Sequence, residues 1–564
     1  MSNNRITFLY VSFLFWAVIV SVRLFYWQVL SKDKFTFALE KQISSQGNVL
    51  PERGNIYAND NFPLVMNEDR FLLYAWTPQI TQDFASVLAK IKPIIFNSED
   101  EDRIELLKSN FSDEEKQWFL IKSNISSQEK QKIDQLNISG LQFEQESLRS
   151  YPEGSMSAQL LGFLGKDEVG KQMGYFGLEG FYQKQLSGLV GFEKNINGIF
   201  KWLEVGDIEK EAKNGRDLQL FLDRSVQFIV EEELKNALTR YGAKGGWVVV
   251  MDSESGGILG MASFPNFDPE KYYNYPYEFL SNPTISESFE PGSIFKPLIM
   301  AAAINENLVS ADTKCDICSG PLQIGEYEIK TWNEVYHPGS TMQEVIKNSD
   351  NVGMVFVARK LGLEVMLEYL NSYNLTQATG IDLQGEMSPS VRDQKNWYPI
   401  DLATSSFGQG IAITPIQFIT AFNSLANNGE VVKPRVVNKI ISDKEEWSTE
   451  KEVVSQPLKP SSVNEITEIM ISAVNEGEAK WAKPEGYSIA GKTGTAQIPV
   501  GGDYDQEKTI ASFIGFAPAD KPKFTMLVSL KEPSSSPWGS ETAAPLWFSI
   551  AQKLFNYYGI PSTN

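Results

Sequence analysis

The stretch "EPGSIFKPLIMAAAIN", residues 290–305, places a serine and a lysine three residues apart at the start of an apolar segment. Pro297 lacks a backbone N–H and is tolerated only in the first turn of a helix. The helix is therefore predicted to begin close to Ser293, where unpaired N–H groups give it a positive end. Lys296 follows the chain toward a core, where it loses hydration, so its presence calls for a functional explanation.

A neutral lysine one helical turn from a serine can accept the proton of the hydroxyl group, which is otherwise a weak nucleophile. Ser293 is therefore a candidate nucleophile, and Lys296 is a candidate general base. A capping serine followed by a surface lysine would give the same pattern, and an isolated Ser-x-x-Lys occurs by chance in many proteins. The pair alone does not decide between the two interpretations.

Two later motifs favour the catalytic interpretation. "KNSDNVG" contains a Ser-Asp-Asn triplet at residues 349–351, in a break between helical segments. "AGKTGTA" contains Lys-Thr-Gly-Thr at residues 492–495, on a predicted strand. Each could be a turn, a cap or a strand end. Ser-x-x-Lys, Ser-x-Asn and Lys-Thr-Gly in this order are typical of penicillin-binding proteins and serine β-lactamases.

With the three motifs together, the chain resembles the class B penicillin-binding proteins, the monofunctional transpeptidases that cross-link peptidoglycan. The resemblance covers most of the sequence outside the polar region around 97–140 and the last few residues. It includes "RLFYWQVL" (23–30), "PERGNIYANDNFPLVMN" (51–67), "RSYPEGSMSAQLLGFLG" (149–165), "GLEGFYQKQLSGLVG" (177–191), "FGQGIAITPIQ" (407–417) and "SFIGFAPAD" (512–520).

The resemblance implies roles in acylation for the matching residues. Ser293 would attack the carbonyl between the two terminal D-alanines of a stem peptide, and Lys296 would receive its proton. Backbone N–H groups of Ser293 and Thr495 would hold the oxyanion. Ser349 and Lys492 would pass the proton to the leaving nitrogen. An amine of a neighbouring strand would then take the acyl group, whereas a β-lactam would remain attached.

The resemblance also implies substrate-binding roles. Asn351 would bind the peptide backbone, and the hydroxyl groups of Thr493 and Thr495 would hold the terminal carboxylate together with Lys492. Gly494 lies between the two threonines and is counted with the binding strand. No metal or organic cofactor is required by this chemistry.

The C-terminal part, residues 216–564, is predicted to be one domain of mixed helices and strands. Residues 217–222 form a predicted strand, an amphipathic helix follows and closes at Gly242, and "GWVVVMD" and "GILGMAS" form a hairpin. "YSIAGKTGTAQI", "TIASFIGFAP" and "FTMLVSLKE" are three more predicted strands near the other end. Strands from both ends could join in one sheet. The fold class is therefore α+β, and the resemblance implies the penicillin-binding transpeptidase fold, an antiparallel sheet flanked by helices.

The N-terminal segment is predicted to be a membrane anchor. Residues 6–22 contain no charge, and the apolar character continues to residue 30, which suits one transmembrane helix after a short tail of residues 1–5. A cleaved signal peptide is the alternative, but no small-x-small cleavage site follows. The flanking charges leave the topology open. The resemblance implies a single-pass protein of the bacterial inner membrane, with its catalytic domain outside the cytoplasm.

Residues 31–215 carry no catalytic motif and are predicted to form a pedestal, comparable to a dimerisation domain, with a small helical insert or surface arm in the polar run around 97–140. The pedestal would set the height of the active site above the bilayer. It would also present a surface to a membrane-embedded glycan polymerase and to other cell-wall synthesis proteins.

Composition narrows the remaining possibilities. The net charge of -20, from 71 acidic and 51 basic residues, argues against a nucleic-acid partner. Cys315 and Cys318 suit a local disulfide or two free thiols better than zinc, which takes about four ligands. His337, the only histidine, is interpreted as a loop residue.

Three other functions remain to be weighed. A β-lactamase shares the motifs but would not ordinarily carry an anchor and a long N-terminal region. A D,D-carboxypeptidase differs only in using water as the acceptor, and a non-catalytic cell-wall scaffold is disfavoured by the three intact motifs. The motifs do not distinguish a role in cell division from one in elongation and cell shape.

Overall fold

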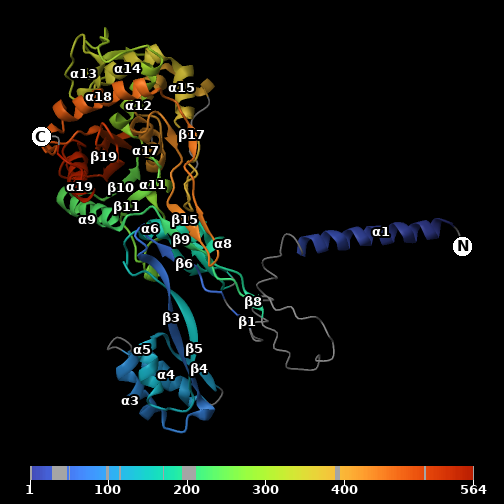
Figure 1. The fold of residues 1–564 in the computed structure, drawn as a ribbon. Coiled ribbons are helices and arrows are strands. Elements are labelled where there is room, and N and C mark those ends of the chain that lie inside the picture. Colours follow the sequence, from blue (N-terminus) through green and yellow to red (C-terminus); the bar gives the residue numbers. More distant parts are fainter. Residues whose placement is uncertain are drawn as a thin grey trace. The chain divides into compact units, whose positions relative to one another are not determined.

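The computed structural model describes residues 3–27, 48–49, 51–96, 101–113, 116–168, 170–192, 211–387, 394–500 and 503–562 (Figure 1). The chain forms two compact units. The first comprises Met1–Gly54, Lys166–Met173 and Lys184–Arg216. The second comprises Asn55–Gly165, Gly174–Gln183 and Asp217–Asn564 and contains all three motifs.

The first unit contains helix α1 (Asn3–Phe25) and a short antiparallel pair of strands, β1 (Asn48–Val49) and β8 (Gly191–Phe192). Apolar side chains of α1 are exposed, among them Phe13, which is 74% exposed. None of the helices in the described part of the chain combines the length and the apolarity that a bilayer crossing requires. The transmembrane helix predicted for residues 6–30 is therefore not confirmed.

The catalytic part of the second unit is built on a five-stranded antiparallel sheet of order β11-β10-β20-β19-β18. The prediction that strands from both ends of the domain join in one sheet is confirmed, and so is the predicted hairpin β10–β11. The strands are β10 (Gly245–Asp252), β11 (Ile258–Phe264), β18 (Ala490–Val500), β19 (Asp503–Ala517) and β20 (Phe524–Lys531).

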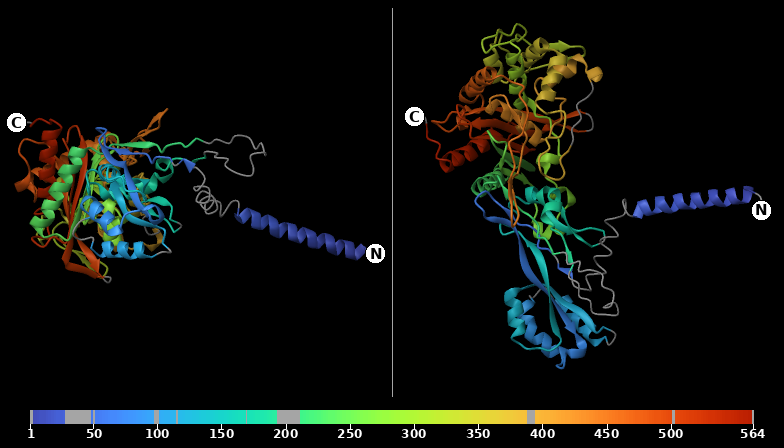
Figure 2. Two further views of the ribbon diagram at one scale, coloured as in Figure 1. Left: turned by 90° about the horizontal axis from the view of Figure 1, so that it is seen from below. Right: turned by 45° about the vertical axis from the view of Figure 1, so that its right-hand side comes forward.

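Two helices from opposite ends of the domain, α9 (Arg224–Tyr241) and α19 (Ala543–Tyr557), lie side by side and cover one face of this sheet (Figures 1 and 2). Between them and the sheet lies an apolar core that includes Val248, Phe513 and Trp547. Helix α9 begins after Asp223, whose carboxylate accepts backbone hydrogen bonds, and ends at Gly242 with φ 61°, as the sequence predicted.

The other helices flank the sheet and carry two of the motifs (Figure 1). Helix α12 is buried along its whole length and packs against α14 and α18. A disulfide between Cys315 and Cys318 lies in the loop after α12, which resolves the alternative left open by the sequence. The helices are α12 (Lys296–Asn305), α13 (Met342–Lys347), α14 (Asn351–Leu361), α15 (Leu363–Ser372), α16 (Pro399–Ser405), α17 (Pro415–Asn423) and α18 (Pro460–Glu476).

A second sheet has the order β16-β15-β9-β2-β3-β4, and β5 also pairs with β3. In it β9, the predicted first strand of the C-terminal domain, pairs in parallel with β2 and antiparallel with β15. The strands are β2 (Ile56–Tyr57), β3 (Pro63–Trp76), β4 (Trp118–Ser126), β5 (Leu141–Ser150), β9 (Asp217–Leu220), β15 (Val437–Ile441) and β16 (Glu446–Ser448).

Within residues 66–150, three helices pack on the sheet formed by β3, β4 and β5. They are α3 (Phe84–Ile95), α4 (Glu101–Ser112) and α5 (Ser127–Asp134). The prediction of a helical insert here was partly wrong. Residues 118–126 form strand β4, in which Phe119, Ile121 and Ile125 are buried. Residues 118–121 are all apolar and residues 122–124 are all polar, so the sequence of this strand shows no period-two pattern.

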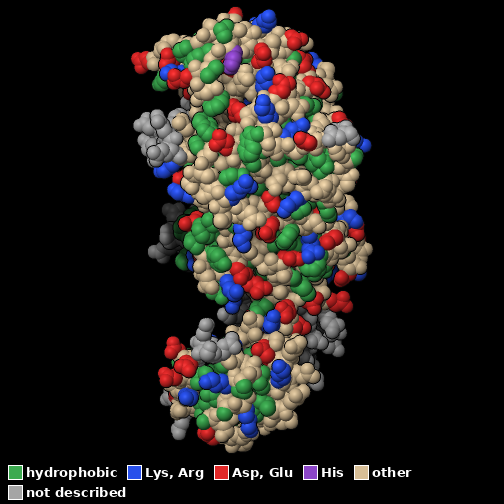
Figure 3. Space-filling view, turned by 90° about the vertical axis from the view of Figure 1, so that its left-hand side faces the viewer, with side chains coloured by type: hydrophobic (Ala, Val, Ile, Leu, Met, Phe, Trp, Pro, Cys, Tyr) green, Lys and Arg blue, Asp and Glu red, His purple; other side chains and the backbone are tan. Residues whose placement is uncertain are grey.

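Short elements complete the fold. They are η3 (Thr77–Gln79), α6 (Ala158–Leu161), β6 (Phe163–Lys166), β7 (Gln172–Tyr175), α7 (Gly177–Phe181), α8 (Gln183–Leu186), η4 (Pro269–Asn274), α10 (Tyr277–Leu280), α11 (Pro283–Ser286), η5 (Gly292–Phe295), β12 (Leu322–Ile324), β13 (Tyr327–Ile329), η6 (Gln394–Asn396), η7 (Ser424–Ala426), β14 (Val431–Val432), β17 (Val453–Ser455) and η8 (Lys480–Ala482). Acidic and basic side chains are interspersed on the face drawn in Figure 3.

Candidate active site

The first motif lies where the sequence predicted it, at the start of an apolar helix. Ser293 is in the 3-10 turn η5, which continues directly into α12 at Lys296, with Pro297 in the first turn. Gly292 precedes the serine with φ 60°, and its N–H donates to the Gly408 carbonyl at 3.0 Å. The turn that carries the Ser293 hydroxyl group is therefore held by a hydrogen bond to the loop that contains Gly408, which is distant in sequence.

The amino group of Lys296 joins the first motif to the second. The side chain is fully buried. Its Nζ donates to the Ser349 carbonyl at 2.6 Å, to Asn351 Oδ1 at 2.9 Å and to Ser349 Oγ at 3.2 Å. Lys296 therefore contacts Ser349 and Asn351 of the second motif. Ser293 lies one turn before Lys296, so the structure brings four predicted site residues together.

Burial lowers the pKa of Lys296 well below that of an exposed lysine, and the neighbouring positive charge of Lys492 lowers it further. Asp350 and Glu478 act in the opposite direction because their negative charges favour the ammonium form. The net effect lowers the pKa and so shifts the equilibrium toward the neutral amine, the form that can accept a proton.

The second motif has a strained backbone. Ser349 is buried and has φ 56°, a conformation that is unusual for a residue with a side chain. Asp350 then caps α14, since its carboxylate accepts from the Gly353 N–H at 3.1 Å. Asn351 Nδ2 donates to the Lys330 carbonyl at 2.9 Å. The cap and this hydrogen bond hold the Ser349 and Asn351 side chains in place.

The third motif lies on β18, at the edge of the five-stranded sheet. Lys492 is buried, which lowers its pKa, and its Nζ donates to Thr493 O and Oγ1, each at 3.2 Å. Gly494 allows β18 to approach the serine turn, since a Cβ there would lie 2.9 Å from Ile294 Cγ2. The Thr495 hydroxyl accepts from the Gly539 N–H at 3.0 Å.

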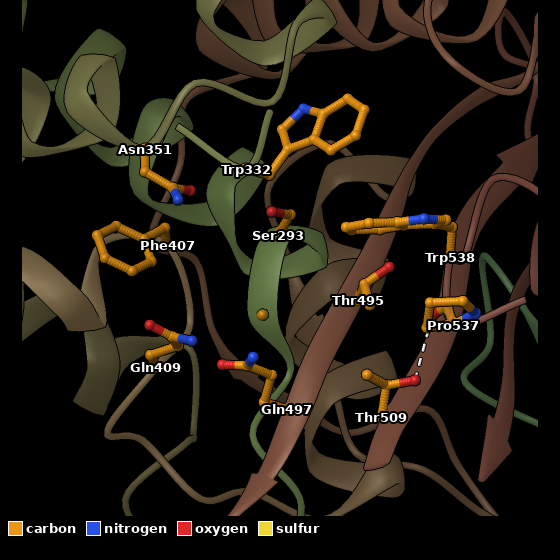
Figure 4. A pocket seen from close by; sticks show the side chains of 11 residues that line it. Ser293, Trp332, Asn351, Phe407, Gln409, Thr495, Gln497, Thr509, Pro537 and Trp538 are labelled. Atoms are coloured by element: carbon orange, nitrogen blue, oxygen red, sulfur yellow. Dashed lines mark hydrogen bonds between the residues drawn. The ribbon is translucent and has the colours of Figure 1, made fainter. Parts of the chain in front are cut away.

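Ser293, Asn351 and Thr495 meet in one cleft of about 280 Å³ (Figure 4). Sequence reasoning assigned no role to most of the other lining residues. A period of two along β18 would have pointed to Gln497 after Thr495, but no local pattern identifies the loop residues. The further lining residues are Gly292, Trp332, Phe407, Gln409, Gln497, Thr509, Pro537 and Trp538.

Two tryptophan side chains from loops also line the cleft. The indole rings of Trp332 and Trp538 meet edge to face with their centroids 5.1 Å apart. They come from the loop before α13 and the loop after β20, respectively. Among the residues that the structure describes, no three His, Cys, Asp or Glu side chains cluster in a way that could hold a metal ion.

Comparisons with known proteins identify the domains of the chain. Residues 246–555 match the penicillin-binding protein transpeptidase domain, and residues 48–220 match the penicillin-binding protein dimerisation domain. Stage V sporulation protein D of Bacillus subtilis is 30% identical over 551 residues, covering 96% of this chain and 84% of the relative. Peptidoglycan D,D-transpeptidase FtsI of Escherichia coli K12 is 30% identical over 423 residues, covering 74% of this chain and 68% of the relative.

Solved structures show the same fold. Penicillin-binding protein 3 of Mycobacterium tuberculosis, in complex with aztreonam, superposes with a TM-score of 0.70 at 24% identity. The superposition covers 92% of this chain and 98% of that chain.

Proposed function

The chain belongs to the class B penicillin-binding proteins, and from this membership we propose how its residues carry out the reaction of the family. The protein is a serine-type D,D-transpeptidase that cross-links peptidoglycan stem peptides and is acylated by β-lactams. The observation that carries the assignment of residues is the buried amine of Lys296, which is bonded to the second motif and lies one turn from Ser293.

In acylation, Ser293 Oγ attacks the carbonyl between the two terminal D-alanines, and Lys296 accepts the hydroxyl proton. The lowered pKa of Lys296 supports this role because a neutral amine is required at the moment of attack. The N–H groups of Ser293 and Thr495 stabilise the negative oxygen of the tetrahedral intermediate. The close approach of β18 to η5, which Gly494 permits, supports their pairing.

Collapse of the intermediate breaks the peptide bond and releases D-alanine. The proton that Lys296 has accepted passes through Ser349 Oγ, 3.2 Å from Lys296 Nζ, to the leaving nitrogen. Lys492 assists this transfer as a second buried lysine whose positive charge acts on Lys296.

Substrate binding uses the strand and the start of α14. Lys492, Thr493 and Thr495 bind the terminal carboxylate of the donor, with Gly494 between the threonines. Asn351 binds the donor backbone, and its hydrogen bonds to Lys296 and to the Lys330 carbonyl support a fixed orientation of its carboxamide.

The acyl group is then transferred to an amine of a neighbouring stem peptide. A D,D-carboxypeptidase would use water instead. Incubation with a defined stem peptide and an amine acceptor, followed by mass spectrometry, separates the two: a cross-linked product identifies the transpeptidase, and shortened peptide alone identifies the carboxypeptidase.

The nucleophile is tested by Ser293→Ala. We expect covalent labelling by fluorescent penicillin to be lost while thermal unfolding stays close to that of the unchanged protein, because the turn is held by Gly292 and Pro297. Label that persists on a folded Ser293→Ala protein would assign the nucleophile to another residue.

The protein is further proposed to act at the bacterial inner membrane, anchored by residues 6–30, with residues 31–215 as pedestal and residues 216–564 as transpeptidase domain. The exposed apolar side chains of α1 support the anchor. The pedestal is the proposed contact for a membrane-embedded glycan polymerase. Loss of sedimentation with membranes on deletion of residues 1–31 tests the anchor, and co-purification of the polymerase tests the contact.

A further inference from the structure

The sheet formed by β3, β4 and β5 has two faces of different character. The core beneath α3, α4 and α5 contains alternate residues of β3 and β4, namely Leu73, Ala75, Phe119 and Ile121. Successive side chains of a strand point to opposite faces, so the neighbouring residues lie on the other face. They are Leu72, Tyr74, Trp76, Trp118 and Leu120. None of them belongs to that core, and each is half-buried or exposed. This second face is here called the open face.

Aromatic side chains occupy the part of the open face formed by β3 and β4. Tyr74 lies opposite Leu120, and Trp76 lies opposite Trp118. The rings of Tyr74 and Trp118 stack with their centroids 5.4 Å apart and an angle of 25° between their planes. Trp118 is nevertheless 49% exposed. Tyr74 therefore supports one side of an indole ring that still presents a large apolar surface to solvent.

The part of the open face formed by β5 carries groups that accept hydrogen bonds. Gln142 lies opposite Tyr74, and Glu144 lies opposite Leu72, so both side chains are on this face. Both residues are exposed. The pKa of Tyr74 is raised by burial and then by the negative charges of Glu144 and Glu146, which agrees with carboxylates beside the aromatic pair. The open face therefore combines apolar rings with carboxylate and carboxamide oxygens.

We propose that the open face binds the glycan strand of peptidoglycan, with a sugar ring stacked on Trp118 and sugar hydroxyl groups donating to Gln142 and Glu144. The inference rests on the proposed function, which supplies a polymer of N-acetylated amino sugars as the substrate. None of these three residues lines the cleft at Ser293. The glycan contact is therefore separate from the site that reacts with the stem peptide.

The chemistry of the open face matches a sugar better than other partners. A sugar ring presents C–H groups with small positive partial charges, which the negative face of an indole ring attracts. Its hydroxyl groups donate hydrogen bonds that carboxylate and carboxamide oxygens accept. An apolar protein surface would leave these acceptors without donors. An anionic lipid surface would be repelled by Glu144 and Glu146.

The full-length protein and immobilised oligomers of β-1,4-linked N-acetylglucosamine test this contact, with the dissociation constant measured from retention on the column. The oligomers carry no stem peptide, so the cleft at Ser293 does not contribute. Trp118→Leu keeps an apolar side chain but removes the ring, and we expect the dissociation constant to rise about tenfold. Binding should not depend on salt concentration, because the oligomers are uncharged. Trp481→Leu, which replaces a 64% exposed tryptophan of η8, is the matched control and should bind like the unchanged protein.

Two substitutions of Glu144 test the hydrogen bonds independently of the ring. Glu144→Leu removes the acceptor, and we expect the dissociation constant to rise about threefold, the effect of losing one hydrogen bond. Glu144→Gln keeps a carbonyl oxygen and should bind within about twofold of the unchanged protein. Because Glu144 is exposed, both variants should unfold at the temperature of the unchanged protein. If Trp118→Leu does not unfold cooperatively, the two Glu144 variants provide the comparison.

Several results would overturn the proposal. The unchanged protein might not be retained by the oligomers, Trp118→Leu might be retained equally well, or Trp481→Leu might lose as much binding as Trp118→Leu. A sedimentation coefficient that falls on Trp118→Leu would mean that a second copy of the chain covers the open face. Covalent labelling by penicillin should be the same for Trp118→Leu and the unchanged protein. Failure of the unchanged protein to be labelled would instead overturn the proposed function, whatever its retention.

Discussion

In the proposed mechanism, the amine of Lys296 and the charges around it set the pH range in which Ser293 can react. Burial and Lys492 lower the pKa of Lys296, whereas Asp350 raises it. A base must be deprotonated, so acylation decreases as the pH falls through this pKa. The charges of Lys492 and Asp350 should therefore affect the rate of acylation through the pKa of Lys296.

Asp350→Asn and Lys492→Met are expected to move the acid limb of the pH profile in opposite directions. Asparagine at position 350 can still cap α14 but no longer favours the ammonium form, so the midpoint should shift to lower pH. Removing the positive charge of Lys492 should shift it to higher pH, with a lower maximal rate. The measurement is the second-order rate of acylation by benzylpenicillin across pH. Shifts of the same sign would exclude Lys296 as the titrating base.

The residues that the sequence could identify are those with a local signature. Ser293 and Lys296 share one turn, and Pro297 fixes where that turn begins, so their proximity follows from spacing alone. Gln409 and Trp538 reach the same cleft only because distant loops pack against η5 and β18. The positions of these two residues depend on packing between segments that are distant in sequence, so the spacing of residues in the sequence does not predict them.

Among the elements, the contact between β18 and η5 would determine the geometry of the proposed oxyanion site. Gly494→Ala would place a Cβ 2.9 Å from Ile294 Cγ2 and 3.1 Å from Ile294 N, so the strand or the turn must move. Displacing reacting groups by about 1 Å can cost about a hundredfold in rate. We expect acylation by benzylpenicillin to fall at least tenfold, an order-of-magnitude estimate on the same basis.

Gly320→Ala is the matched control, because a Cβ there meets no atom within 4 Å. It should leave the acylation rate unchanged. A rate close to that of the unchanged protein for Gly494→Ala would show that the glycine is not needed for the approach of strand to turn.

The elements also show where sequence patterns are sufficient. The hairpin β10–β11 and helix α9 were predicted because their periodicity and caps are local. Strand β4 was missed because its sequence does not alternate: residues 118–121 are all apolar, residues 122–124 are all polar, and the strand lies in a stretch that resembles a polar helix. Its pairing with β3, which is distant in sequence, makes it a strand.

At the scale of the second unit, a buried ion pair joins β5 to α7. Arg149 Nε lies 2.7 Å from Glu179 Oε1, with side chains 3% and 0% exposed, and Arg149 also donates to Asn67 at 2.8 Å. Glu179→Gln leaves the buried guanidinium without its counter-charge, which we expect to lower the free energy of unfolding by about 3–5 kcal/mol. Denaturant unfolding measures this change.

Lys130→Met provides the comparison, because it removes the exposed pair with Asp134 on α5 and should change the free energy of unfolding by less than about 1 kcal/mol. Equal effects of the two substitutions would show that the buried pair contributes no more than a surface one. Penicillin labelling of folded Glu179→Gln protein should persist, since the pair lies outside the residues that line the cleft.

The order of strands in the five-stranded sheet also determines how much of the chain must be translated before the sheet can form. β10 and β11 emerge from the ribosome early, but β10 pairs on its other side with β20, which ends at Lys531. Until β20 has been made, β10 presents an unpaired edge on which another chain could add a strand. A chain terminated before β20 would contain the serine and lysine of the first motif, but the pair of strands β18 and β19 would lack the strand that joins it to β10. Covalent labelling of nascent chains by penicillin should therefore begin only when translation of the chain is almost complete.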